Sequence, residues 1–147
     1  MASDLGDLYQ EILLEHNRRP RNFRELADAT HHADGFNPLC GDQISLQLKV
    51  NHDSGVVDDV GFQGHGCAIS RASASLLTQA VKGRTVEGAS DVSQLFRDMM
   101  QGKPLPPVAM VELGELSALE VVRQYPVRIK CALLPWVALE DGLRQLR

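Results

Sequence analysis

Apolar and polar residues alternate in two short segments near the middle of the chain. Residues 44–51 alternate over the whole run, which is the two-residue period of a half-buried β-strand. Residues 56–62 hold the apolar residues of a second strand, and residues 52–55 between the two segments have the composition of a turn. This pattern predicts an antiparallel hairpin.

A lone hairpin is barely stable in water, so we expect a third strand in the sheet. We place it in residues 25–36, although the sequence marks it poorly. The wider segment of residues 21–36 is polar and irregular. Its adjacent histidines, His31 and His32, are expected to be solvated loop residues rather than ligands.

Apolar residues recur at helical spacing on both sides of the hairpin. Residues 5–17 predict a first helix, and residues 68–81, rich in Ala, Ser and Leu, predict a second. The apolar residues after Cys131 predict a C-terminal amphipathic helix that begins at this cysteine. Pro135 then falls in the first turn, where its missing N–H matters least. Together the elements predict an α+β fold with helices packed on one face of a small antiparallel sheet.

The section from residue 83 to residue 116 has a weaker pattern. Residues 92–100 predict a short helix, and the Gly- and Pro-rich residues 102–107 break it. Residues 116–122 predict another helical turn or two. Because no internal repeat or low-complexity segment divides the chain, we expect a single domain over residues 1–147.

The composition is that of a soluble globular protein. The 147 residues are 44% hydrophobic and 23% charged, which argues against disorder. The 5% aromatic content and the net charge of -4 argue against nucleic-acid binding. No apolar run reaches about 18 residues, so no membrane span is expected. The acidic N-terminal residues lack the features of a signal peptide, and a cytoplasmic location is the default expectation.

The three cysteines lie in marked surroundings. Cys40 precedes a glycine and Asp42, Cys67 lies where the second strand gives way to a helix, and Cys131 follows Lys130. A helix N-terminus and a neighbouring positive charge both lower the pKa of a thiol, so Cys67 and Cys131 are predicted to be thiolate-prone. An odd number of cysteines forms no self-contained disulfide framework, and in a reducing compartment such cysteines indicate metal binding or catalysis.

Cys40, Asp42, Cys67 and Cys131 together offer three sulfurs and one oxygen, and zinc prefers four such ligands in a tetrahedron. The set lacks paired Cys-x-x-Cys motifs, so spacing alone leaves open whether these thiols bind metal or act as small buried hydrophobes. A carboxylate in place of a fourth thiolate favours an exchangeable site. His65 is either an assistant in proton transfer, a substitute ligand or a solvent-facing turn residue.

The three cysteine motifs together resemble those of the U-type scaffold family of iron–sulfur cluster assembly, which includes IscU, the NifU N-terminal domain and SufU. The motifs are Asn-Pro-x-Cys-Gly-Asp, Gly-x-Gly-Cys-Ala-Ile-Ser and Arg-Ile-Lys-Cys, and the resemblance covers nearly the whole chain. Two features are similar to the SufU branch. Lys130 stands where the IscU branch has histidine, and residues 83–116 look like the insertion of SufU proteins.

The resemblance implies a zinc site at Cys40, Asp42, Cys67 and Cys131, with Cys40 as the sulfur acceptor. It implies a sulfurtransferase that accepts persulfide sulfur from a SufS-type cysteine desulfurase, a pyridoxal phosphate enzyme. In the mechanism proposed for the family, a partner histidine takes over at zinc and frees the acceptor thiol. We expect a monomer that docks on a desulfurase dimer and serves the downstream iron–sulfur assembly machinery.

Two other functions remain open at this point. The first is a scaffold on which an iron–sulfur cluster is assembled by the same four groups; Lys130 argues against it, because lysine is a poor ligand unless it is neutral. The second is a purely structural zinc module. The glycine-rich surroundings of the cysteines and the carboxylate ligand argue against that function.

Overall fold

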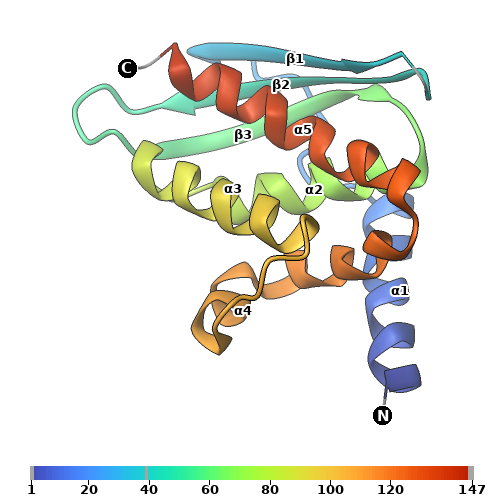
Figure 1. Ribbon diagram of the computed structural model, residues 1–147. Helices are drawn as coiled ribbons and strands as arrows, with labels where there is room; N and C mark the ends of the chain where they lie inside the picture. The colour runs from blue at the N-terminus through green and yellow to red at the C-terminus, as the bar shows by residue number, and fades with distance from the viewer. Residues whose placement is uncertain (1, 39, 146–147) are drawn as a thin grey trace.

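The computed structural model describes the backbone of residues 2–38 and 40–145, and the side chains of residues 6–38 and 40–145. Three strands form one antiparallel sheet in the order β1-β2-β3 (Figure 1). They are β1 (His31–Asn37), β2 (Asp42–Val50) and β3 (Val57–His65). The predicted hairpin is confirmed as β2 and β3.

The third strand lies close to its predicted place, within residues 25–36, and extends one residue beyond it. His31 and His32 are therefore strand residues, and the expectation that they lie in a loop is wrong. The strand was hard to recognise because only Ala33 and Asn37 in it are buried. Backbone pairing with β2, rather than an apolar pattern, holds β1 in the sheet.

The helices pack on one face of the sheet, which confirms the predicted α+β fold. Alternate residues of β2 and β3 turn toward the helices and are at most 1% exposed: Ile44, Leu46, Leu48, Val60 and Phe62. The last helix lies across β1 and β2, and the second lies along β3 (Figure 1). The helices are α1 (Ala2–Arg18), α2 (Ala68–Val81), α3 (Val86–Met100), α4 (Pro107–Leu113), the 3-10 helix η1 (Gly114–Gln124) and α5 (Pro126–Arg144).

The section after α2 is more helical than its sequence predicts. α3 begins six residues before the predicted start, because the Thr85 side chain accepts a hydrogen bond from the Gly88 N–H and caps the helix. α4 was not predicted, since its apolar residues span fewer than two turns. Within the described residues, no helix combines the length and hydropathy needed to cross a lipid bilayer.

Three helices meet at Trp136, which fixes their relative positions. Its ring stacks on Phe96 of α3 with a centroid distance of 4.8 Å. Its indole N–H donates to Ser73 Oγ of α2 at 3.1 Å, and this hydroxyl donates to the Ala132 carbonyl at 2.6 Å. The aromatic contact and the satisfied buried polar groups lock α2, α3 and α5 together.

The last helix begins five residues earlier than predicted. Pro126 occupies the first helical position, so Cys131 lies in the second turn and not at the N-terminus. Pro135 lies inside the helix rather than in its first turn, and it lacks the N–H that would bond the Cys131 carbonyl. The N-terminal positions predicted for Cys131 and Pro135 are both wrong.

Close packing of α5 along β1 determines where Cys131 lies. A Cβ atom on Gly35 would lie 3.1 Å from Leu134 Cδ1, and one on Gly142 would lie 3.3 Å from the Ala33 Cβ atom. The helix therefore runs nearly in contact with the strand. At its N-terminal end this packing brings the Cys131 side chain to the turn that joins β1 and β2.

Candidate metal centre

The turn between β1 and β2 carries the first two predicted ligands. The Asn37 carbonyl accepts hydrogen bonds from the N–H groups of Cys40 at 3.3 Å and Gly41 at 2.8 Å. Gly41 has a φ of 71°, a left-handed conformation that favours glycine. As a result Cys40 lies exposed at the turn, whereas Asp42 begins β2 and is fully buried.

A second turn, between β3 and α2, brings Cys67 to the same place. Cys67 is the N-cap residue of α2, as the sequence predicted, and its N–H donates to Asp42 Oδ1 at 2.8 Å. A Cβ atom on Gly66 would lie 2.6 Å from both Asp42 Oδ1 and Ser70 Oγ. The glycine before Cys67 is therefore required for the close approach of this turn to the carboxylate.

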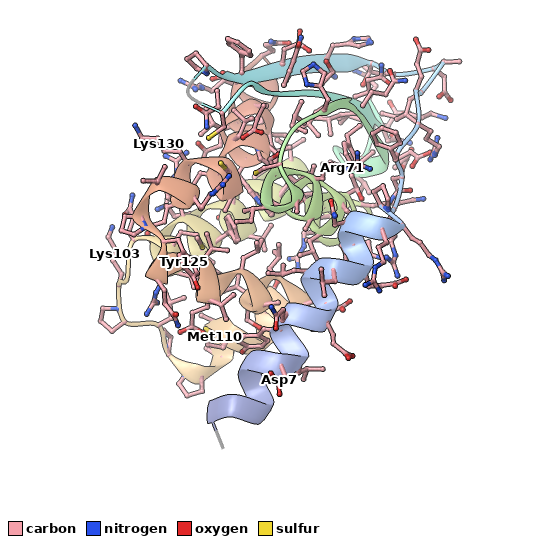
Figure 2. The ribbon with its side chains drawn as sticks, turned by 90° about the vertical axis from the view of Figure 1, so that its right-hand side faces the viewer. Asp7, Arg71, Lys103, Met110, Tyr125 and Lys130 are labelled. Carbon is pink, nitrogen blue, oxygen red and sulfur yellow. The ribbon has the colours of Figure 1, made fainter. Side chains whose placement is uncertain are left out.

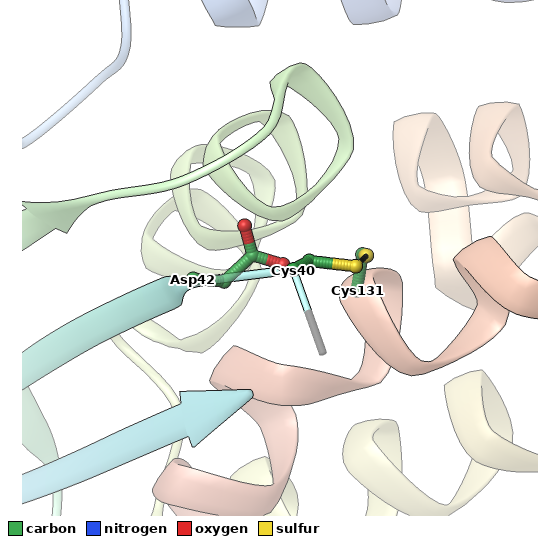
Figure 3. A group of neighbouring side chains, drawn as sticks. All are labelled: Cys40, Asp42 and Cys131. Carbon is green, nitrogen blue, oxygen red and sulfur yellow. Dashed lines mark hydrogen bonds between the residues drawn. The ribbon is translucent and has the colours of Figure 1, made fainter. Parts of the chain in front are cut away.

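Three of the four predicted ligands, Cys40, Asp42 and Cys131, form one cluster (Figure 3). Potential donor atoms of Cys40, Asp42 and Cys131 all lie within 4.8 Å of one another. The sulfurs of Cys40 and Cys131 are 3.7 Å apart. Cys67 lies beside this group, with its sulfur 3.9 Å from Asp42 Oδ2. Residues from three separate parts of the sequence thus come together at one end of the sheet, with Cys67 just outside the group of three.

These spacings suit a single zinc ion. Zn–S bonds of about 2.3 Å at tetrahedral angles put two sulfurs roughly 3.8 Å apart, and a sulfur and a carboxylate oxygen roughly 3.5 Å apart. The separations of 3.7 Å between the sulfurs of Cys131 and Cys40 and 3.9 Å between Cys67 Sγ and Asp42 Oδ2 are close to these values. A fully buried carboxylate such as Asp42 also requires a compensating partner, which a cation would supply. The chemistry of Cys40, Asp42 and Cys131 therefore fits zinc, and Cys67, beside Asp42, is the nearest candidate for a fourth ligand.

The Cys131 thiol has an unusual electrostatic environment. Burial, followed by hydrogen bonding with Asp42, Cys40 and Cys67, raises its pKa far above the ordinary thiol value. The sequence predicted the opposite direction, on the assumption that Cys131 lies at a helix N-terminus. Without a cation this thiol keeps its proton at neutral pH, because the charged form is poorly solvated and faces other acidic groups.

Arg128, rather than Lys130, supplies the positive charge at the cluster. A hydrogen bond with Cys131, and then the charges of the three thiol groups, raise the pKa of the Arg128 guanidinium. The sequence assigned this role to Lys130, which lies next to Cys131 but is exposed and points away from the molecule (Figure 2). The i,i+3 spacing of Arg128 and Cys131 within one helix is the signal that could have identified the arginine.

Asn37 contacts the cluster, whereas His65 lies outside it. Asn37, which the sequence did not single out, is 7% exposed, and its side-chain N–H group donates to Cys131 Sγ at 3.9 Å. His65 is the last residue of β3, pairs with Gln43 across the strands and is exposed. Among the described residues, His65 and Cys67 both lie outside the group of potential ligands, but only Cys67 has an atom in contact with a member of it, Asp42.

The chain matches known proteins over most of its length. The NifU-like N-terminal domain family matches residues 8–132. The chain is 45% identical over 141 residues to the zinc-dependent sulfurtransferase SufU of Bacillus subtilis (strain 168), covering 96% of this chain and 92% of SufU. It is 39% identical over 143 residues to the iron–sulfur cluster assembly scaffold protein IscU of Streptococcus pyogenes serotype M1, covering 97% and 87%.

Solved structures agree with these matches. FiSufU from the thermophile Fervidobacterium islandicum AW-1 has a TM-score of 0.83 at 32% identity, covering 90% of this chain and 94% of that one. The N-terminal part of a nitrogen-fixing NifU-like protein from Brucella abortus has a TM-score of 0.82 at 27% identity, covering 95% and 94%. The chain belongs to the NifU-like N-terminal domain family, which confirms the resemblance inferred from the cysteine motifs. The single domain over residues 1–147 and the insertion at residues 83–116 stay predictions.

Proposed function

We propose that this protein is a zinc-dependent sulfurtransferase of iron–sulfur cluster biogenesis. In this proposal Cys40, Asp42, Cys67 and Cys131 hold zinc, and Cys40 accepts sulfur from the persulfide of a SufS-type cysteine desulfurase. A cytoplasmic location and delivery of sulfur to the downstream iron–sulfur assembly machinery are part of the proposal. The 45% identity to a protein named zinc-dependent sulfurtransferase supports it.

The observation that carries the proposal is the unequal exposure of the thiols in one cluster. Cys131 is buried, Cys67 is half-buried and Cys40 is exposed, although the sulfurs of Cys40 and Cys131 are only 3.7 Å apart. Structural zinc sites are closed to solvent and substrate, whereas reactive sites keep one position accessible. A cluster with one thiol at the surface suits a reaction with a group on another protein.

Transfer of sulfur makes Cys40 the nucleophile. Its thiolate attacks the outer sulfur of the donor persulfide, and a new S–S bond forms as the bond between the donor's two sulfurs breaks. The donor cysteine leaves as a thiolate, and Cys40 becomes the persulfide. The exchange needs no external oxidant or reductant, because one S–S bond replaces another.

The remaining residues of the cluster hold the site in place during this reaction. Bound zinc would keep the ligating thiols deprotonated and oriented. The Cys67 N–H group fixes the Asp42 carboxylate, and the Arg128 side chain contacts Cys131. Cys40 lies in a turn and can move without disturbing a helix or a strand.

The surface near the cluster is suited to docking on a partner protein. Three large apolar residues close in sequence to the cluster are more than half exposed: Phe36 (63%), Tyr125 (60%) and Val127 (72%). Arg128 and Lys130 on α5 add positive charge to a chain whose net charge is -4. Exposed apolar residues with a basic rim are typical of protein interfaces. We assign this surface to a desulfurase dimer that binds the protein as a monomer.

The scaffold function is the second candidate. Several relatives are named iron–sulfur cluster assembly scaffold protein IscU, including the Streptococcus pyogenes protein. The same three thiols and Asp42 would then ligate iron. Lys130 beside Cys131 disfavours this function, because a protonated lysine cannot act as a ligand.

The test combines the zinc-loaded protein, its cognate desulfurase and cysteine. Intact mass and a peptide map under non-reducing conditions are expected to show added sulfur on Cys40, together with stimulation of the desulfurase. Cys40→Ala is expected to lose both. Ser54→Ala, in the exposed turn between β2 and β3, is the matched control and is expected to keep both.

Absence of added sulfur on every cysteine, without stimulation, would contradict the sulfurtransferase function. Anaerobic loading with iron and sulfide then tests the scaffold function. A cluster on the wild-type protein that is lost with Asp42→Ala would favour the scaffold.

A further inference from the structure

Asn37 lies outside the predicted ligand set, yet it interacts with three members of that set: Cys131, Cys40 and Asp42. The Asn37 side-chain N–H group donates to Cys131 Sγ at 3.9 Å, and its carbonyl accepts the Cys40 N–H at 3.3 Å. Across the strands, Asn37 is the register partner of Asp42. The packing of α5 along β1 buries Asn37 against α5, so the residue is only 7% exposed.

The three thiols have different hydrogen-bonding environments. The Cys131 sulfur accepts a hydrogen bond from the neutral amide of Asn37 and interacts electrostatically with the charged side chain of Arg128. In the part of the chain that the structure describes, the side-chain partner of the Cys40 sulfur is the Cys131 thiol. Among the described side chains, the buried thiol therefore has an N–H donor, that of Asn37, whereas the exposed thiol at the turn has none.

We propose that Asn37 is a positioning residue whose side-chain amide keeps the Cys131 sulfur as the fixed ligand and so leaves Cys40 as the thiol that reacts. The inference rests on the proposed function, since it concerns the choice among thiols at the same zinc site. In this proposal Asn37 affects zinc only through the ligand Cys131 and does not itself contact the metal or the substrate.

The physical basis is the effect of an N–H···S bond on a thiolate. A donor at the sulfur withdraws electron density, stabilises the anion and lowers its nucleophilicity. Hydrogen bonds to ligand atoms also orient them and tune the metal. The amide of Asn37 is buried and does not titrate, so its effect is independent of pH and little screened by salt. Arg128 is exposed, and its contribution falls as salt increases.

The group that donates to the sulfur is distinct from the group that organises the turn. The turn is organised by the Asn37 carbonyl, which every substitution at this position retains. Asn37→Leu removes the donor from the sulfur and places an apolar group of similar size in a buried position. Asn51 offers a matched control at the other end of the sheet. Its side-chain oxygen accepts the N–H groups of Asp53 and Ser54, so Asn51→Leu weakens a turn far from the thiols.

The experiment measures the rate of iodoacetamide modification at each cysteine of the zinc-loaded protein by peptide mass mapping. In the wild type, Cys40 is expected to react fastest and Cys131 slowest. In Asn37→Leu, the rate at Cys131 relative to Cys67 is expected to rise about tenfold, and zinc affinity against a chelator is expected to fall about 10- to 100-fold. Asn51→Leu is expected to keep the wild-type order of rates and the wild-type zinc affinity.

A spectroscopic measurement completes the test. In the cobalt-loaded protein, loss of the N–H donor raises the energy of the sulfur electrons, so the thiolate-to-cobalt charge-transfer band is expected to move to longer wavelength in Asn37→Leu and not in Asn51→Leu. A general loss of stability would not move this band. If Asn37→Leu does not fold, Asn37→Asp, which keeps the shape and replaces the donor with an acceptor, is expected to raise the Cys131 rate in the same way.

The two proposals fail in different ways. A wild-type protein that binds no zinc and gains no sulfur on Cys40 contradicts the proposed function. A wild type that does both, with a folded Asn37 variant whose Cys131-to-Cys67 rate ratio and cobalt band are unchanged, contradicts the role of Asn37 alone.

Discussion

The two turns of the sheet are built in different ways. The turn between β1 and β2 is organised by a backbone carbonyl, that of Asn37, and leads directly into the buried Asp42. The turn between β2 and β3 is organised by the Asn51 side chain, and residues 51–54 in it are exposed. The first turn lies against α5 and the start of α2, which bring Cys131 and Cys67 to it (Figure 1). The β1–β2 turn is thus a candidate site because helices pack against it and bury its polar groups, whereas the β2–β3 turn stays exposed.

The largest effect that distinguishes the two turns is expected from their aspartates. Asp42→Asn removes a buried anionic donor from the cluster and is expected to weaken zinc binding by about 100-fold or more, beyond the usual effect of a residue that only supports a ligand. Asp53→Asn makes the same change in the exposed turn and is expected to leave zinc affinity unchanged. Competition with a chelating dye measures both.

Equal zinc affinity in the two aspartate variants would remove Asp42 from the ligand set. The folded state of each variant is checked by far-ultraviolet circular dichroism, so that a loss of affinity is not confused with unfolding.

A somewhat smaller effect is expected at the glycine that allows Cys67 to approach Asp42. Gly66→Ala places a methyl group 2.6 Å from Asp42 Oδ1 and Ser70 Oγ, and relieving this overlap is expected to cost about 1–3 kcal/mol of unfolding free energy. The displaced carboxylate is also expected to weaken zinc binding. Urea denaturation of the metal-free protein measures the first effect, and chelator competition measures the second. A variant as stable as the wild type would contradict the tight approach of this turn.

Each of the two turns contains one left-handed glycine, and these two glycines form a matched pair. Gly41 has a φ of 71° and Gly55 a φ of 72°, and neither has an atom within 4 Å of an added Cβ atom. Alanine at either position is expected to cost about 1–2 kcal/mol through backbone strain alone. Only Gly41→Ala is expected to change zinc affinity and the reactivity of Cys40, because Gly41 lies between two predicted ligands. Equal zinc affinities in the two variants would contradict a distinct role for the first turn.

The sequence predicted the elements whose pattern is strong and missed those fixed by packing. The alternation in residues 44–51 and the helical period in residues 68–81 identified β2 and α2. β1 was hard to predict because the strand is mostly polar and is held in the sheet by backbone pairing, which leaves no apolar pattern in the sequence. The start of α5 was misplaced by five residues, since Pro126 rather than the cysteine motif begins the helix.

At the candidate site, too, the sequence predicted the features marked by local motifs and missed those that depend on packing between elements. The cysteine motifs identified the three residues that the structure groups together, Cys40, Asp42 and Cys131, and also Cys67 beside them. Each lies next to a glycine, a strand end or a basic residue that is visible in the sequence. The direction of the Cys131 pKa shift could not be predicted, since it depends on burial by α5 and on Asp42 from another element. Asn37 and Arg128 were missed as functional residues for the same reason. Their roles follow from the packing of α5 against β1.

The smallest effect is expected from Arg128 and Lys130, the two basic residues near Cys131. They test whether Arg128 supplies the positive charge at the cluster, as the structure indicates, rather than Lys130, as the sequence predicted. Arg128→Gln removes the guanidinium that contacts Cys131 and is expected to slow alkylation of the thiols in the metal-free protein a few-fold, because the positive charge favours their reactive thiolate forms. Lys130→Gln removes the same charge from a side chain that points away and is expected to have little effect. Because Arg128 is exposed, the difference should shrink as salt increases. An equal effect of both variants would mean that net charge alone, and not the contact made by Arg128, governs the thiols at the first turn.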